Sequence, residues 1–156
     1  EARKFGRIRH LGFSAHSVDA ALAAMDRFPF DSILFPVNFA TYHKGNFGPQ
    51  IMERARAKGV ARLALKALAR QKWPLESAKR QKYPKCWYEP LTERHEAELA
   101  LRFTLGQPVT AALPPGDESL FRLALDLAMQ FRPLTDTENQ ELVRMASDLQ
   151  PVFSEA

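Results

Sequence analysis

Three segments of this sequence carry side chains that could bind a small ligand. Ser14 and His16 lie between an apolar stretch and a helix that Ser17 is suited to cap, because its hydroxyl can accept a hydrogen bond from a first-turn amide. Lys66 falls near the end of another apolar stretch, where a buried cation needs a carboxylate or phosphate partner. The turn Pro114–Asp117 precedes a helix, and the amides and dipole of a helix N-terminus favour anions. These segments indicate a site for an anionic ligand.

Each of these residues also has a purely structural interpretation. Ser14 could simply finish a strand, and His16 could be a loop histidine hydrogen-bonded to the backbone. Lys66 could form an internal salt bridge, and Asp117 could cap the helix that follows it. The turn before that helix could serve both purposes, since capping and phosphate binding use the same end of the helix.

Two expected loops carry further candidates. A loop over 40–48 carries Tyr42, which could shape a substrate pocket together with Asn38 and His16, or lie in solvent. A long loop over 70–91, which includes Trp73, interleaves aromatic and basic side chains. It could be a lid over a pocket, a loop packed on the rim, or a nucleic-acid surface; we favour the first two. The spacing of His, Cys and carboxylate residues predicts no metal site.

Alternating strand and helix patterns must position these residues. Four apolar stretches predict strands, and between them lie helices that begin after Ser17, at Pro49, after Thr92 and after Asp117, with a last one opened by a capping box at Thr135. The expected strands cover 8–13, 32–39, 60–68 and 108–113. Such alternation predicts an α/β fold with a parallel sheet, either a small doubly wound sheet or part of a barrel. In either fold, ligands bind at the carboxyl ends of the strands.

Composition limits the broad class. The chain has 156 residues, 46% hydrophobic and 26% charged, which is ordinary for one globular domain over 1–156. No apolar run reaches the length of a membrane span. The net charge of +4 is dispersed, so we expect no nucleic-acid partner. The single Cys86 fits a reducing compartment, and we expect a cytoplasmic protein. The start, which lacks Met, hints at a truncated chain.

An ordered set of segments resembles the second half of an aldo/keto reductase. The matching segments are Gly6-Arg-Ile-Arg-His-Leu-Gly-Phe-Ser-Ala-His-Ser17, Phe30-Asp-Ser-Ile-Leu-Phe-Pro-Val-Asn38, Arg56-Ala-Lys-Gly-Val60 and Pro108-Val-Thr-Ala-Ala-Leu-Pro-Pro-Gly116. The resemblance implies a partial TIM (β/α)8 barrel, with four parallel strands, alternating helices and a C-terminal helix. This chain would supply strands five to eight of an enzyme that reduces carbonyls with NADPH. The family's catalytic Asp, Tyr, Lys and His come from the first four strands, so the resemblance implies no catalytic residue here.

The same resemblance assigns cofactor contacts residue by residue. Ser14 matches a serine that touches the nicotinamide amide, and Lys66 falls near a position that contacts the cofactor phosphate or ribose. Pro114, Gly116 and Asp117 belong to a turn whose backbone amides approach the phosphates. Some positions depart from the family: Ala15 and Pro36 replace an Asn and a Gln, and Asp117 and Glu118 stand where a basic residue usually holds the 2′-phosphate, with Arg122 as the substitute nearby. The resemblance implies NADP as the cofactor, and NAD stays open because a carboxylate near the 2′-phosphate would repel it.

The resulting hypothesis is an NAD(P)H-dependent carbonyl reductase of which this chain provides cofactor-binding and loop elements. Its small-molecule carbonyl substrate would meet His16, Asn38, Tyr42 and Trp73. The alternative is a non-catalytic half-barrel that self-associates, because a half-barrel leaves two unpaired edge strands.

Overall fold

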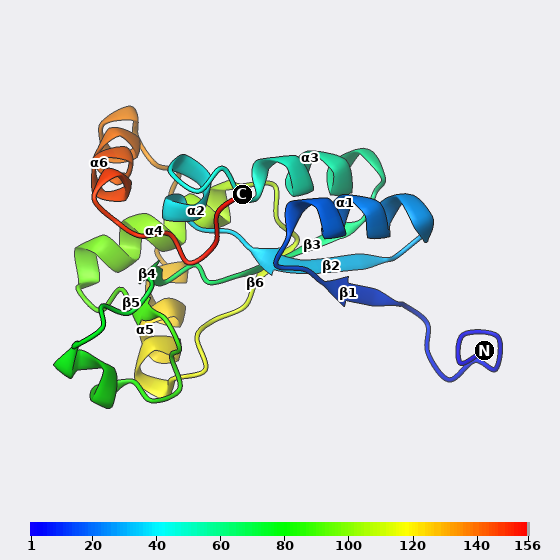
Figure 1. Ribbon diagram of the computed structural model, residues 1–156, viewed down its shortest axis with the longest axis horizontal. Helices are drawn as coiled ribbons and strands as arrows, with labels where there is room; N and C mark the ends of the chain where they lie inside the picture. The colour runs from blue at the N-terminus through cyan, green and yellow to red at the C-terminus, as the bar shows by residue number, and fades with distance from the viewer. Residues whose placement is uncertain (156) are drawn as a thin grey trace.

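A four-stranded parallel sheet, in the order β1-β2-β3-β6, forms the centre of the computed structural model, which describes residues 1–155 (Figure 1). The strands are β1 (Gly12–Ser14), β2 (Ser32–Pro36), β3 (Ala61–Leu65) and β6 (Ala111–Ala112). Leu34 stands beside Ser14 on one side and Leu63 on the other, and Leu63 stands beside Ala111. The predicted set of four parallel strands is confirmed.

Helices separate the strands along the chain, as the sequence pattern predicts. They are α1 (Val18–Arg27), α2 (Phe39–His43), α3 (Pro49–Ala57), α4 (Arg94–Gly106), α5 (Glu118–Ala128) and α6 (Asp136–Ser147). Their ends follow local chemistry. The Ser17 hydroxyl accepts from the Ala20 amide, Thr135 and Glu138 form a capping box, and Gly59 follows α3 with φ of +67°.

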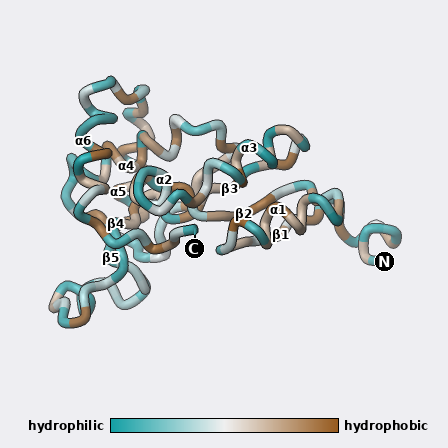
Figure 2. The backbone as a smooth tube through the Cα atoms, turned by 45° about the horizontal axis from the view of Figure 1, so that its top comes forward, coloured by the Kyte–Doolittle hydropathy of each residue, from teal (hydrophilic) through white to brown (hydrophobic). Residues whose placement is uncertain are grey.

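Two hydrophobic clusters hold these layers together. In the first, α1 and α3 lie side by side over one face of the sheet (Figure 1), and Met25 and Ile51 pack with Ile33 and Phe35 of β2. The backbone tube is accordingly hydrophobic along β2 (Figure 2). The second cluster joins α2, α4, α5 and α6 through fully buried residues that include Leu99 and Leu142. Ile33, Phe35 and Ala64, which point toward α1 and α3, are fully buried, so these two helices anchor the sheet on that face.

Several predicted boundaries were wrong. The first strand begins at Gly12 instead of Ile8, and Gly12 is the residue that pairs with Ser32 at the start of β2. The third strand ends at Leu65 rather than at 68, and the fourth covers only two residues. The expected loop over 40–48 begins with the short helix α2, which Asn38 caps. Glu93 rather than Thr92 precedes α4, and its side chain makes no capping hydrogen bond.

The expected long loop is more ordered than its sequence indicates. It starts and ends in a small antiparallel pair, β4 (Ala69–Gln71) with β5 (Glu89–Pro90), and contains a 3₁₀ turn, η1 (Ala78–Lys82). The Lys72 amide also donates to the carbonyl of Gln150 at 3.0 Å, which ties the start of this segment to the C-terminal segment after α6. Within residues 1–155 no helix is long and apolar enough to span a bilayer.

Candidate functional site

The carboxyl ends of the four strands meet at one edge of the sheet, and most of the candidate residues lie there. Backbone hydrogen bonds continue just past the strands: the Ala15 amide donates to the Leu34 carbonyl at 3.1 Å, and the Leu113 amide donates to the Ala64 carbonyl at 2.8 Å. These hydrogen bonds place the loop after β1 and the Pro114 turn after β6 at the same height along the strand direction. In parallel α/β sheets such an edge is the usual place for a ligand.

Lys66 is the first residue after β3, and its backbone takes an unusual conformation. Its φ is +69°, a left-handed value that L-residues adopt at a cost of about 1 kcal/mol. Two contacts hold its carbonyl: the Ala69 amide donates to it at 2.8 Å, and the Asn38 side-chain amide donates at 3.3 Å. The turn directs the chain away from the sheet and toward β4.

The Lys66 amine lies against aromatic rings instead of a carboxylate. Its Nζ is 4.9 Å from the ring centroid of Trp87 and 4.8 Å from that of Tyr88. Burial lowers the pKa of this amine. Among residues 1–155 no ion pair of Lys66 occurs, so two cation–π contacts take the place of the salt bridge considered from the sequence. The positive charge is thus positioned but not neutralised by an anionic side chain.

A pocket of about 210 Å³ opens beside this amine. Lys66 and Lys85 contribute positive charge to it, Trp87 and Tyr88 form an aromatic wall, and the turn after β6 closes it. The full lining is Leu65, Lys66, Ala67, Lys85, Trp87, Tyr88, Leu113, Pro114, Pro115 and Gly116. The structure therefore brings together Lys66, Pro114 and Gly116, three residues that the sequence resemblance assigned to one ligand.

Asp117, also assigned to the ligand, is occupied in capping α5. Its Oδ1 accepts from the Ser119 amide at 3.0 Å, the Leu120 amide at 3.2 Å and the Ser119 hydroxyl at 2.6 Å. The hydroxyl bond is the main cause that lowers the pKa of Asp117, and the charge of Lys85 lowers it further. The carboxylate thus takes two of the amides that a phosphate at this helix end would use.

Ser14 and His16 lie at the same carboxyl ends of the strands as Lys66, but they follow β1 instead of β3. Ser14 ends β1 with an exposed side chain, and His16 stacks on Phe153 with ring centroids 4.8 Å apart and an interplanar angle of 10°. Burial and the positive charge of Lys66 both lower the pKa of His16. Phe153 also meets Trp87 edge to face at 5.8 Å. Phe153, in the C-terminal segment after α6, therefore links the loop after β1 to the aromatic wall of the pocket.

The other three candidates do not line this pocket. Asn38 is buried, and its side-chain oxygen accepts from the Thr41 amide at 2.9 Å to cap α2. The Tyr42 ring packs edge to face on Phe103 at 5.4 Å, and burial raises the pKa of its phenol. Trp73 donates its ring N–H to the Cys86 carbonyl at 2.8 Å and packs beside Tyr83 and Leu120. These contacts stabilise the segments around the edge.

Four residues near this edge were not singled out as ligand contacts from the sequence. Lys85, Trp87 and Tyr88 belong to the basic and aromatic alternation in 70–91, which pointed to the segment but not to these members. Phe153 carried no signal, because its contacts with His16 and Trp87 join parts of the chain that are far apart in sequence.

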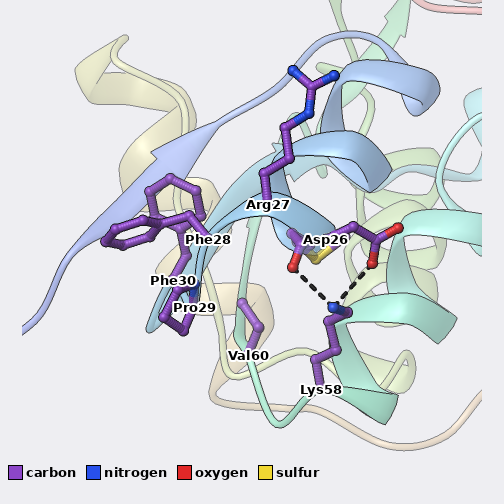
Figure 3. A pocket seen from close by; sticks show the side chains of 8 residues that line it. Asp26, Arg27, Phe28, Pro29, Phe30, Lys58 and Val60 are labelled. Atoms are coloured by element: carbon purple, nitrogen blue, oxygen red, sulfur yellow. Dashed lines mark hydrogen bonds and ion pairs between the residues drawn. The ribbon is translucent and has the colours of Figure 1, made fainter.

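A larger pocket of about 350 Å³ lies at the opposite end of the sheet, near the start of β2 (Figure 3). Phe28, Pro29 and Phe30 form its apolar side, and Lys58 faces Asp26 across it (Figure 3). The Lys58 amine is 2.9 Å from the Asp26 carboxylate and also donates to the Met25 carbonyl at 2.9 Å. Lys58 and Asp26 thus satisfy each other, unlike the cations of the pocket beside Lys66.

Solved structures of aldo-keto reductases share this fold. The holo form of aldo-keto reductase AKR11C1 from Bacillus halodurans aligns with a TM-score of 0.59 and 19% identity, over 92% of this chain and 50% of that one. The glycerol dehydrogenase AKR11B4 from Gluconobacter oxydans gives 0.54 and 21%, over 94% and 51%. The thermostable aldo-keto reductase Tm1743, in complex with the inhibitor epalrestat, gives 0.54 and 18%, over 92% and 51%.

This chain thus spans about half the length of the structures it resembles. No protein-family model matches the sequence, and no curated protein matches it. The likeness confirms the predicted fold class: four parallel strands with helices, equivalent to half of an aldo-keto reductase barrel.

Proposed function

We propose that this chain is the dinucleotide-binding half of an aldo-keto reductase-like oxidoreductase, equivalent to strands five to eight of the barrel. The observation that carries the proposal is the Lys66 amine, which borders a pocket at the carboxyl edge and rests on Trp87 and Tyr88 instead of a carboxylate. A cation held in this way is suited to the phosphate of a dinucleotide. The proposal treats residues 1–156 as one domain, and the single cysteine is consistent with a cytoplasmic protein.

The pocket's chemistry fits the diphosphate part of NADP or NAD. Lys66 and Lys85 would face the phosphate oxygens, and Gly116 leaves its backbone open, since no atom lies within 4 Å of the place where a Cβ would stand. The Asp117 carboxylate disfavours a second phosphate at the N-terminus of α5, because it already accepts hydrogen bonds from two amides there. NADP is the cofactor that the family resemblance favours, and this carboxylate is the feature that would favour NAD.

Ser14 and His16 are suited to the other end of such a ligand. Both lie at the end of β1, across the edge from Lys66, and Phe153 supports the His16 ring from behind. When bound, the dinucleotide would supply the hydride for carbonyl reduction. The residues of this chain would hold and orient it, whereas the acid that protonates the carbonyl oxygen would come from outside the chain.

Binding of NADPH and NADH to the purified chain, followed by nucleotide fluorescence, tests this function. We expect Lys66→Gln to weaken NADPH binding about tenfold or more, the range of one charge-assisted phosphate contact. Lys79→Gln is the matched control, because Lys79 is an exposed cation of η1 outside the pocket lining. The proposal would be overturned if neither NADPH nor NADH bound the chain, or if Lys66→Gln and Lys79→Gln weakened nucleotide binding equally.

The same preparation should show no carbonyl reductase turnover, even with NADPH bound. The reason is that the family's catalytic residues lie in the half of the barrel that this chain does not supply. NADPH oxidation is measured with a panel of aldehydes and ketones, and nucleotide binding in the same sample serves as the positive control. Turnover by the pure chain would show that the assignment to strands five to eight is wrong.

A further inference from the structure

The surroundings of the Lys66 amine are those of a nucleophilic lysine. Its Nζ lies against the rings of Trp87 and Tyr88, and among residues 1–155 no carboxylate pairs with it. Burial lowers the pKa of this amine, so more of it is unprotonated than in a solvated lysine. An amine attacks a carbonyl carbon only in its unprotonated form, and protein lysines that form imines are desolvated in the same way.

The groups beside the amine do little to retain its proton. Cys86 is the group whose negative charge would raise the pKa of Lys66, but burial raises the pKa of its own thiol, which is therefore neutral at neutral pH. The ring faces attract the protonated amine, but the Trp87 side chain is 53% exposed, and cation–π contacts at exposed rings are weak. The free amine thus faces the pocket with no anion beside it.

The pocket also favours an anionic group on whatever reaches the amine. Its lining includes Lys66 and Lys85 and no carboxylate. The nearest acidic group that the charge of Lys85 affects is Asp117, whose carboxylate already accepts hydrogen bonds from Ser119 and Leu120 at the start of α5. The backbone of Gly116 is uncovered on the same wall, since no atom lies within 4 Å of the place where a Cβ would stand. Lys85 is therefore available to a phosphate while Lys66 reacts.

We propose that Lys66 is an imine-forming lysine, and that its pocket takes aldehydes that carry a phosphate group. The Lys66 Nζ adds its electron pair to the aldehyde carbon, and the proton that it loses passes to the carbonyl oxygen. The resulting carbinolamine then releases water, so that a C=N bond replaces the C=O bond. No oxidant or reductant is consumed, and the imine is reversible by hydrolysis. This reaction goes beyond the proposed function, because it requires neither a dinucleotide nor hydride transfer.

Pyridoxal phosphate, an aldehyde with a phosphate and an absorbing imine, tests the proposal on the full chain. Borohydride reduces the imine to a stable amine, and peptide mass spectrometry then locates the adduct. We expect one adduct per chain, at Lys66. Lys66→Arg keeps the positive charge but should abolish the adduct. The matched control is Lys79→Gln, which removes an exposed lysine outside the pocket and should leave labelling unchanged.

Pyridoxal, which lacks the phosphate, separates anion recognition from amine reactivity. Titrated through imine absorbance, it should bind about tenfold or more weakly than pyridoxal phosphate, the range of one charge-assisted contact. Lys85→Gln should remove most of this difference. Lys85 is exposed, so this variant also tests the pocket if Lys66→Arg fails to fold.

Two results would overturn the proposal: adducts spread over the exposed lysines with no preference for Lys66, or equal affinity for pyridoxal and its phosphate. NADPH binding is measured on the same preparation, without the aldehyde. A chain that binds NADPH but forms no adduct at Lys66 refutes only the imine. A chain that forms the adduct but binds neither nucleotide refutes only the proposed function.

Discussion

At the scale of single residues, Lys66 combines a strained backbone with an isolated charge. Its left-handed φ lets the chain turn from β3 toward β4, and the same turn lays its amine on Trp87 and Tyr88. Strain of this kind persists only where the surroundings hold it, and here the Asn38 amide and the Ala69 amide both bind the Lys66 carbonyl. The left-handed backbone of Lys66 therefore lowers the local stability and at the same time positions the amine on the two rings.

Replacing Lys66 by glycine and by alanine separates these two roles. Both variants lose the amine, so both should lose nucleotide binding to the same degree. Only alanine keeps the left-handed strain of an L-residue, and we expect Lys66→Gly to be more stable than Lys66→Ala by about 1 kcal/mol. Urea unfolding of the two proteins measures the difference. If alanine proved the more stable of the two, the left-handed conformation assigned to this position would be wrong.

At the scale of elements, a buried arginine fixes α6 to α4. Arg102 is 1% exposed and donates to both carboxylate oxygens of Glu138 at 2.8 Å, and to the carbonyls of Arg132 and Pro133 at 2.8 Å. Glu138 also closes the capping box with Thr135. Because the guanidinium is desolvated, removing Glu138 leaves a buried cation without its main partner, which destabilises the fold.

The Arg102–Glu138 pair makes the stability of the folded chain depend on pH in the acid range. Hydrogen bonds from Arg102, then from Arg132, hold the pKa of Glu138 far below its usual value of 4.5. Since the folded-state pKa is depressed, this contribution is fully present above pH 4.5 and is lost as the pH falls below it. We expect Glu138→Gln to be less stable than wild type at neutral pH and to show a flatter loss of stability in acid. Chemical denaturation across this pH range measures both effects.

Glu118→Gln is the matched control for that experiment. Glu118 pairs with Arg122 one turn along α5, but both side chains are largely exposed, so solvent screens the interaction. Its replacement should leave the acid profile unchanged. Equal slopes for wild type and Glu138→Gln would contradict the role assigned to the Arg102 pair.

The elements also show what the sequence alone could provide. Ser17, Gly59 and Thr135 were readable because a cap is decided by residues within one turn of each other. The short helix α2 was missed because its stability comes from burial of Phe39 and from the Asn38 cap, rather than from a periodic pattern. The same limit applies to the site: the strand-end position of Lys66 was visible, whereas the Trp87 and Phe153 contacts depend on tertiary folding.

At the scale of the whole molecule, the open edges predict which backbone amides a partner should protect. In the single chain, the amides of Gly12 and Ser14 point away from β2, whereas that of Ala15 is bonded to Leu34. Hydrogen exchange should therefore be fast at Gly12 and Ser14 in dilute protein. In the alternative of a self-associating half-barrel, exchange at both amides should slow as concentration rises, because pairing with an edge strand of a second copy would bond them. The Ala15 amide is the internal control, and its protection should depend far less on concentration.

Nucleotide binding at Lys66 makes a different prediction for the same amides, which separates the proposed function from the self-associating alternative. A ligand at the carboxyl edge would protect Ser14 at any protein concentration and leave Gly12, two residues deeper along the edge, unaffected. Protection of both amides by concentration alone would favour the self-associating half-barrel, and protection of Ser14 alone by NADPH would favour the nucleotide site beside Lys66. Fast exchange of Gly12 at every concentration would mean that β1 keeps an open edge and that the second copy does not pair there.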